Sequence, residues 1–201
     1  MSFYSIANPI SSKQKIKHSD FLAFLFPINS VQEAESIISQ HRKELPDATH
    51  HCFAYISGFN RENQYYSDAG EPFGTAGKPI LNALLSANMT NILAIVTRYF
   101  GGIKLGTVGL AKAYTGVVQS ALAKAEKIPA IPYIIYHLVL DYHSINLLKY
   151  KISSFDGHII EEKWDNRAQL KVQIPLESSK EWEEFINGLK LKFYLDYYKE
   201  E

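Results

Sequence analysis

The chain of 201 residues is poor in cysteine, which limits its covalent and metal chemistry. Cys52 is the single cysteine, so no disulfide can form within one chain. No Cys-x-x-Cys or His-x-x-x-His spacing completes a zinc site. Neighbouring residues of a strand face opposite ways, so only His50 and Cys52 of the 50–52 triplet share a face. We therefore expect a buried, structural thiol, and we predict no metal and no cofactor.

The sequence also lacks long apolar runs and a strong charge of either sign. No stretch reaches the roughly 20 apolar residues that a membrane-spanning helix needs, and the first residues show no signal-peptide pattern. Basic residues (Lys and Arg) and acidic residues (Asp and Glu) number 21 each, so the formal net charge is zero. Nonspecific nucleic-acid binding usually goes with a strongly basic face. We expect a cytoplasmic protein without a membrane partner, in which any basic site is local.

The standard nucleotide and hydrolase motifs are missing as well. A P-loop ending at Gly77–Lys78 would need glycine where Pro72 stands, and serine or threonine where Pro79 stands. The segment 101–106 does not match the G-x-G-x-x-G dinucleotide fingerprint, and no G-x-S-x-G elbow is present. The sequence therefore offers no catalytic residue that can be named.

What the sequence has instead is a concentration of glycine between Asp68 and Ala125. Two glycine-rich loops lie there, each ahead of a predicted helix, and eight of the eleven glycines belong to this stretch: Gly70, Gly74, Gly77, Gly101, Gly102, Gly106, Gly109 and Gly116. A loop that opens a helix gathers unpaired N–H groups at the positive end of the helix dipole, which favours anions. Four cations accompany the loops: Lys78, Arg98, Lys104 and Lys112. We predict a site for an anion, plausibly a phosphate of RNA, built from these cations together with Gly74, Thr75, Gly77, Gly101, Gly102 and Gly106.

Two carboxylates, Asp68 and Glu71, shape the first loop. They could hold Mg²⁺ or share acid–base work, or they could end a strand and pair with Arg98 or Lys78. The glycines could equally serve only to make tight turns. These alternatives stay open at the level of sequence.

Apolar periodicity and turn residues predict an α+β protein with two domains, 1–128 and 133–201. In the first domain we expect strands at 3–10, 14–28, 50–59, 64–67 and 91–97, and helices at 31–44, from Thr75 onward and at about 107–127. The run Ile128-Pro-Ala-Ile-Pro132 reads as a linker. The second domain reads as β-α-β-β-α-β, the ferredoxin-like order, with its last strand at 191–198.

Four strings of the first domain are long and unusual in composition. They are Thr49-His-His-Cys52, Ser67-Asp-Ala-Gly-Glu-Pro72, Gly74-Thr-Ala-Gly77 and Thr97-Arg-Tyr-Phe-Gly-Gly-Ile-Lys-Leu-Gly106. They strongly resemble the Impact/YigZ family, and the resemblance extends over the whole chain.

The resemblance implies a fold for each domain and a link to translation. The N-terminal domain would be like the second domain of small-subunit ribosomal protein five, and the C-terminal domain would be similar to domain five of elongation factor G. Both folds occur in translation components that contact RNA, and eukaryotic Impact members regulate translation. The leading interpretation is therefore a non-enzymatic binding protein with RNA, the ribosome or a translation-related protein as partner. The alternatives are an enzyme acting on a phosphorylated small molecule or nucleotide, and glycine loops with a purely structural role.

Overall fold

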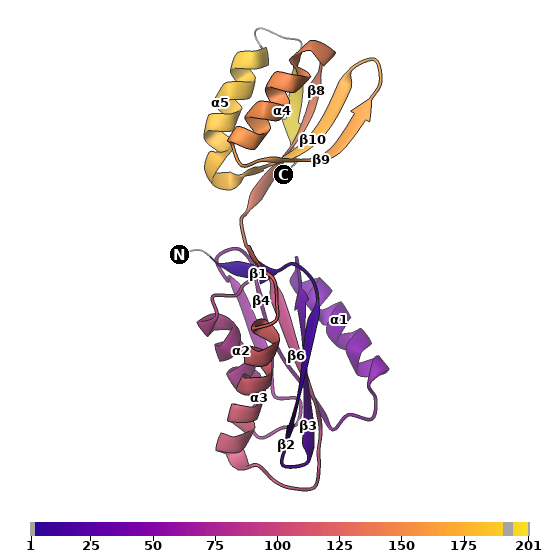
Figure 1. Cartoon of the computed structure of the whole chain (residues 1–201), viewed down its shortest axis with the longest axis vertical. Coiled ribbons are helices and arrows are strands. Elements are labelled where there is room, and N and C mark those ends of the chain that lie inside the picture. The colour runs from indigo at the N-terminus through magenta and orange to yellow at the C-terminus, as the bar shows by residue number, and fades with distance from the viewer. Residues whose placement is uncertain (1–2, 191–194, 201) are drawn as a thin grey trace. The chain divides into compact units, whose positions relative to one another are not determined.

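A computed structural model describes residues 3–190 and 195–200 of the chain (Figure 1). The chain divides into two compact units, Met1–Ala130 and Ile131–Glu201. Both units mix helices with antiparallel sheets. None of the described helices is long and apolar enough to cross a membrane.

The described residues of the first unit form seven strands and three helices. In chain order they are β1 (Tyr4–Ile6), β2 (Ile10–Ile16), β3 (Ser19–Pro27), α1 (Val31–Glu44), β4 (His50–Ser57), β5 (Asn63–Ser67), α2 (Gly77–Ser86), β6 (Ile92–Tyr99), α3 (Gly106–Leu122) and β7 (Lys127–Pro129). Five of the strands form one antiparallel sheet in the order β2-β3-β6-β4-β5.

The two faces of this sheet carry separate cores. Alternate residues of β4 face opposite ways, so Cys52 and Ala54 join the core under α2 and α3, whereas Phe53 and Tyr55 join the core under α1. Figure 1 shows α1 on one side of the sheet and α2 with α3 on the other. Strand β6 is central and buried on both faces, as its unbroken apolar run predicts.

Helix α1 begins where the sequence predicts it. The Ser30 side chain accepts the Glu33 N–H at 3.1 Å, and the Glu33 carboxylate accepts the Asn29 N–H at 2.7 Å. Two backbone donors at the start of the helix are thus satisfied by side chains.

The single strand predicted at 14–28 is wrong, because the chain makes a hairpin there. Lys17 and His18 both have positive φ, 44° and 67°, and they connect β2 to β3. Two positive φ values in a row are what a two-residue hairpin turn needs, but Asn and Gly usually supply them. A Lys-His pair gives no such signal, so the turn could not be read from the sequence.

The hairpin turn fixes the identity of Gly101. A Cβ atom at this position would lie 2.0 Å from the His18 carbonyl oxygen, far inside van der Waals contact. We expect Gly101→Ala to lower the free energy of unfolding of the first unit by about 1–3 kcal/mol, since backbone would have to move. Gly116→Ala is the matched control: its Cβ would meet nothing closer than Gln14 Oε1 at 3.5 Å. In a helix interior that change should be neutral or stabilising by up to about 1 kcal/mol. Urea denaturation measures the free energy of unfolding of both variants. Equal changes in the two variants would contradict the prediction.

The helix predicted to 127 ends at Leu122, and the predicted linker is partly a strand. Strand β7 pairs with β1 in a two-stranded sheet, with Ser5 opposite Ile128. The prolines that suggested a linker do not prevent this, because proline is tolerated at the edge or end of a strand.

The second unit has the element order predicted from the sequence. It consists of β8 (Tyr133–Leu140), a 3-10 turn (Tyr142–Ser144), α4 (Ile145–Ser154), β9 (His158–Trp164), β10 (Ala168–Pro175), a second 3-10 turn (Leu176–Ser178), α5 (Ser179–Lys190) and β11 (Asp196–Lys199). The sheet order is β11-β8-β10-β9, with antiparallel neighbours. Part of the strand predicted at 191–198 lies outside the described residues.

Candidate functional site

The first glycine loop, residues 68–76 between β5 and α2, folds around the carboxylate of Asp68. Its Oδ1 accepts the N–H groups of Ala76 and Gly77, both at 2.9 Å, and its Oδ2 accepts the Gly74 N–H at 2.8 Å. These N–H groups stand at the start of α2, where a free anion would otherwise bind. The anion that this loop holds is therefore a side chain of the protein.

Thr75, at which the sequence predicts this helix to begin, lies before α2 and is not its N-cap. The cap position is Ala76, which makes no side-chain cap hydrogen bond. The Thr75 hydroxyl instead donates to the Pro72 carbonyl at 2.7 Å, closing the loop on itself. The Asp68 side chain caps α2 instead, although it lies nine residues before Gly77. A local capping pattern in the sequence cannot reveal a cap at that distance.

Glu71 of the first glycine loop and Arg98 of β6 form a buried ion pair. Arg98 Nη1 donates to Glu71 Oε1 at 2.5 Å, and only 4% of Arg98 and 8% of Glu71 are exposed. Among the alternatives left open by the sequence, the pairing of Glu71 with Arg98 is the one observed. The charge of Arg98 is thereby balanced inside the protein.

A polar network extends from this ion pair into the core. The Tyr114 hydroxyl donates to Glu71 Oε1 at 2.8 Å, and Cys52 Sγ lies 3.3 Å from that hydroxyl. Burial raises the pKa of the Cys52 thiol to about 12, and burial likewise raises the pKa of Tyr114. Cys52 is therefore a protonated, inert thiol at neutral pH, as the sequence predicts.

His50 completes the side of the network that faces outward. Its Nδ1 lies 2.9 Å from the Ala69 carbonyl oxygen, and its Nε2 lies 4.0 Å from Glu71 Oε1. A carbonyl can only accept, so Nδ1 carries the proton that this bond needs.

The second glycine loop, residues 100–105, connects β6 to α3. A pocket of about 440 Å³ opens between the first and second glycine loops. Its polar lining combines the ion pair with His50, Lys104 and Thr107, and its apolar lining includes Pro72, Phe100, Leu105 and Leu110. The volume is within the range of small-ligand sites. The spacing of the loops along the chain does not reveal His50 or Leu110 as lining residues, because they come from β4 and from the second turn of α3.

The start of α3 at this pocket is open, unlike the start of α2. No side chain caps α3, its first turn holds no acidic residue, and Gly106 and Thr107 line the pocket. Lys104 is exposed beside it, and no described carboxylate lies within ion-pair distance of its Nζ. Unpaired N–H groups, the positive end of a helix and a free ammonium thus meet in one place.

The other predicted cations lie elsewhere on the unit. Lys78 is exposed in the first turn of α2, and Lys112 is exposed in the second turn of α3; neither lines the pocket. Of the predicted glycines, Gly74, Gly102 and Gly106 have positive φ with no close neighbour, so they serve the loop conformation. Gly77 is a close-packing position, since a Cβ there would lie 2.7 Å from the Ser67 backbone.

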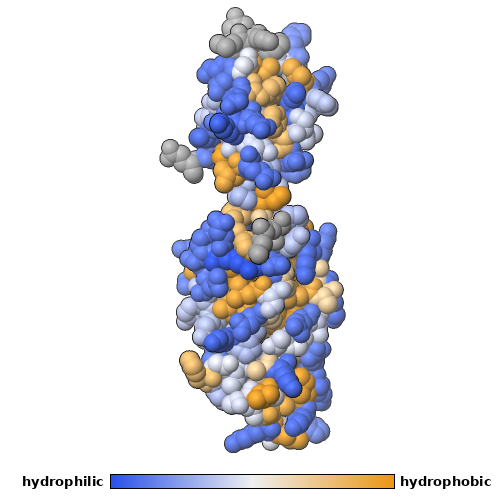
Figure 2. All heavy atoms as spheres, turned by 90° about the vertical axis from the view of Figure 1, so that its left-hand side faces the viewer, coloured by the Kyte–Doolittle hydropathy of each residue, from blue (hydrophilic) through white to orange (hydrophobic). Residues whose placement is uncertain are grey.

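Exposed apolar side chains surround the loops, and sequence reasoning missed them. Phe73 is 93% exposed, and Phe100, Ile103 and Val108 are exposed too. Figure 2 shows hydrophobic side chains on the surface at the lower end of the first unit, where α3 begins in Figure 1. Their positions in the two glycine loops and in the first turn of α3, where polar residues are expected, could have indicated that they are exposed. Clustered exposure of this kind is typical of a surface that meets a partner.

Asp68 and Glu71 do not share a metal site in this arrangement. One carboxylate is bonded to backbone N–H groups, and the other to Arg98 and Tyr114. Within residues 3–190 and 195–200, no group of three or more His, Cys, Asp or Glu side chains could hold a metal ion.

Fold and site together define a two-unit protein of mixed helices and antiparallel sheets, with an ion-pair pocket between paired glycine loops. The Impact N-terminal domain model matches residues 17–122, more than half of the chain, and the chain therefore belongs to the Impact family. It is 38% identical over 171 residues to the IMPACT family member YigZ of Escherichia coli (strain K12), covering 84% of each chain.

Two further comparisons extend this result. The Protein IMPACT homolog of Dictyostelium discoideum is 38% identical over 96 residues, which are 45% of this chain and 27% of that protein. A crystal structure of a hypothetical protein matches with a TM-score of 0.69 and 34% identity, covering 98% of this chain and 96% of the other.

Proposed function

We propose that the protein is a non-enzymatic binding protein in translation or its regulation. In this proposal the pocket between the glycine loops holds a phosphate of RNA or an acidic group of a partner protein. Membership of the Impact family supports the link to translation. The sheet order β11-β8-β10-β9 supports the likeness of the second unit to a ferredoxin-like domain such as domain five of elongation factor G. The likeness of the first unit to the second domain of small-subunit ribosomal protein five is part of the same proposal.

The observation that carries the proposal is the contrast between the two helix starts. At α2 the N–H groups are taken by Asp68, whereas at α3 they are open and stand next to Lys104. An anion at α3 would gain both the helix dipole and a charge-assisted bond to Lys104. Arg98 is part of the pocket wall but adds little net charge to the pocket, because the Glu71 carboxylate neutralises it.

Lys104→Ala tests the proposal without disturbing the fold, since Lys104 is exposed. Binding should be measured by co-sedimentation with ribosomal subunits and by filter binding to purified ribosomal RNA over a range of salt. If Lys104 contacts a phosphate, we expect weaker binding and a decrease of about 1 in the slope of log affinity against log salt. Lys112→Ala is the matched control, because it removes an exposed lysine of α3 that does not line the pocket.

The two partner types give different results. If the wild type binds ribosomal subunits but not purified RNA, and Lys104→Ala loses the subunit binding, the ligand is an acidic group of a ribosomal protein. Equal binding by wild type, Lys104→Ala and Lys112→Ala, or no binding in either assay, would contradict the proposal. Arg98→Ala is unsuitable here, because it would leave the buried Glu71 carboxylate unpaired.

A further inference from the structure

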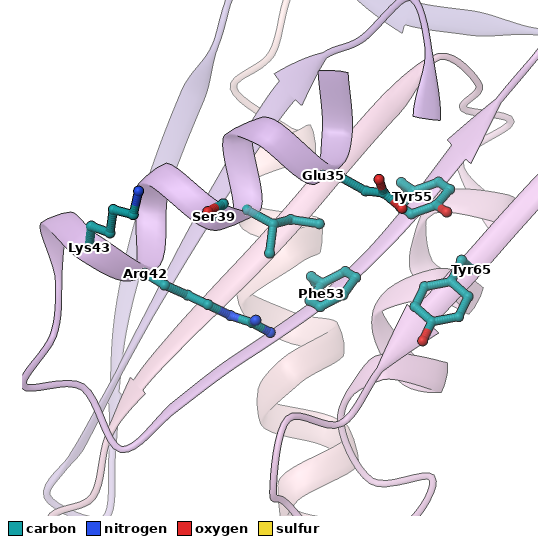
Figure 3. Close-up of a pocket in the computed structure, with 8 residues that line it drawn as sticks. Glu35, Ser39, Arg42, Lys43, Phe53, Tyr55 and Tyr65 are labelled. Carbon is teal, nitrogen blue, oxygen red and sulfur yellow. The ribbon is translucent and has the colours of Figure 1, made fainter. Parts of the chain in front are cut away.

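The opposite face of the first unit has a groove that the loop pocket does not involve. The groove lies between α1 and the strands β4 and β5, and its volume is about 690 Å³ (Figure 3). Helix α1 contributes Glu35, Ser39, Arg42 and Lys43 to it, and the sheet contributes Phe53, Tyr55 and Tyr65.

The sheet side of the groove is an aromatic floor with one exposed ring. Tyr65 lies opposite Tyr55 on neighbouring strands, and their ring centroids are 5.8 Å apart at an interplanar angle of 27°. Phe53 lies 6.0 Å from the same Tyr65 ring. Phe53 and Tyr55 are buried, whereas Tyr65 is 54% exposed. Held in place by two buried rings, the Tyr65 ring offers a flat apolar surface to a ligand.

One end of the groove is cationic. Ser39, Arg42 and Lys43 stand at positions i, i+3 and i+4 of α1, so they share a side of the helix. The Arg42 guanidinium points toward Phe53 in Figure 3 and lies 5.8 Å from the ring centroid. No described carboxylate pairs with Arg42 or Lys43 within 4.0 Å. Two free cations and a hydroxyl in this arrangement suit a phosphate group.

The other end of the groove is acidic. Glu35 lies two turns before Arg42 on the same side of α1, which is about 10 Å along the helix axis. Figure 3 shows its carboxylate beside Tyr55. The pKa of Tyr55 is raised, first by burial and then by the charge of Glu35, so its hydroxyl stays protonated. A carboxylate at this place accepts hydrogen bonds from N–H groups such as those on the edge of a nucleobase.

We propose that the α1 groove binds a nucleotide, with its phosphate on Arg42 and Lys43, its base stacked on Tyr65 and an N–H of the base directed at Glu35. An acid, a flat apolar ring and two cations line this one groove, and a nucleotide presents the three matching groups: N–H donors, a π-face and an anion. An acidic peptide would match the cations but would leave Glu35 facing a like charge. The nucleotide can be free or part of a single-stranded RNA, since both present the same groups.

The test is a titration of the full-length ¹⁵N-labelled protein, followed by amide chemical shifts. The probes are GMP, guanosine, inorganic phosphate, a short single-stranded RNA and an acidic peptide. We expect GMP to shift amides of α1, β4 and β5, and to bind more tightly than either guanosine or phosphate. Tyr65→Ala should weaken GMP binding by at least about fivefold, the lower bound for loss of one base–aromatic stack. Arg42→Ala should weaken the binding of GMP more than that of guanosine.

Controls keep this proposal separate from the one made for the loop pocket. Tyr150→Ala removes a tyrosine that is more exposed than Tyr65 but belongs to the second unit, and it should leave GMP binding unchanged. The amide shifts separate the two sites, because the α1 groove is followed at α1, β4 and β5, and the loop pocket is followed at Gly106, Thr107 and Leu110. Tighter binding of the RNA than of GMP would make RNA the source of the nucleotide, and equal binding would make it a free nucleotide.

Several results would overturn the proposal. They are an absence of shifts with GMP and RNA, equal GMP affinity in wild type and Tyr65→Ala, phosphate alone binding as tightly as GMP, or binding of the acidic peptide in place of nucleotides.

Discussion

Glu71→Gln is expected to lower the free energy of unfolding of the first unit by about 3–5 kcal/mol, the cost of breaking a buried ion pair from one side. The variant keeps the size of the side chain and an oxygen that can accept from Tyr114. It removes the charge that balances Arg98, which is 4% exposed and cannot recover its hydration without unfolding. Native stabilities are usually about 5–15 kcal/mol, so the loss would be a large part of the total.

The two units can be followed separately in this experiment. Both tryptophans, Trp164 and Trp182, are in the second unit, whereas Cys52 is in the first. Fluorescence in urea therefore reports on the second unit, and labelling of the buried thiol with a disulfide reagent reports on the first. We expect Glu71→Gln to shift the labelling midpoint and to leave the fluorescence midpoint in place.

Glu35→Gln is the matched control, because Glu35 is an exposed carboxylate of the same unit without an ion pair among the described residues. Its effect should stay within about 0.5 kcal/mol, as is usual for surface substitutions. An unchanged labelling midpoint in Glu71→Gln would mean that the ion pair contributes nothing net to stability.

Local patterns predicted the parts of the fold that depend on neighbours in sequence. The helix predicted at 31–44 is α1, whose start carries the Ser30–Glu33 bond, and the strand predicted at 91–97 is the apolar central strand β6. The alternation along β4 correctly separated the two faces of the sheet. Each of these features follows from periodicity or from a bond that spans three residues or fewer.

The candidate site was harder to predict, because its bonds join distant residues. Arg98 is 27 residues from Glu71, so the sequence could only offer their pairing as one alternative among several. Nothing local distinguishes Lys104, which lines the pocket, from Lys78, which does not. Their positions depend on how the loops pack against β4, and tertiary packing of this kind leaves no periodic signal.

The helical repeat of α3 could have predicted that Lys112 lies outside the site. Lys112 lies between Leu110 and Ala113, both of which are buried, and it is itself exposed. Its neighbours therefore already placed it at the border of the core face of α3, away from the open first turn. The same phase argument places Tyr114 in the core, but it does not reveal that its hydroxyl is bonded to Glu71.

Asp68→Ala is the second substitution with a large expected effect, about 3 kcal/mol of destabilisation of the first unit. Removal of the carboxylate leaves the N–H groups of Gly74, Ala76 and Gly77 without their partner. Hydrogen bonds to a charged group are typically worth about 1.5–3 kcal/mol each, and water can replace part of this where the loop is accessible. Thiol labelling of Cys52 in urea measures the loss.

Asp68→Asn separates the shape of this cap from its charge. An asparagine oxygen in place of Oδ1 can still accept from Ala76 and Gly77, but its amide would meet the Gly74 N–H donor to donor. We expect about half the loss seen with alanine. Asp47→Ala, which removes an exposed carboxylate in the turn after α1, should have little effect.

Anion rescue gives the sharpest form of this prediction. In Asp68→Ala the start of α2 becomes an empty anion site, like the start of α3, so sulfate should bind there and restore part of the lost stability. Sulfate also stabilises proteins in general through exclusion from their surface, so the quantity to compare is the gain of the variant beyond that of wild type. Asp47→Ala should gain no more than wild type. An equal gain in all three proteins would mean that the N–H groups freed from Asp68 do not form an anion site, and would weaken the inference that the first glycine loop is an anion site already occupied by the protein itself.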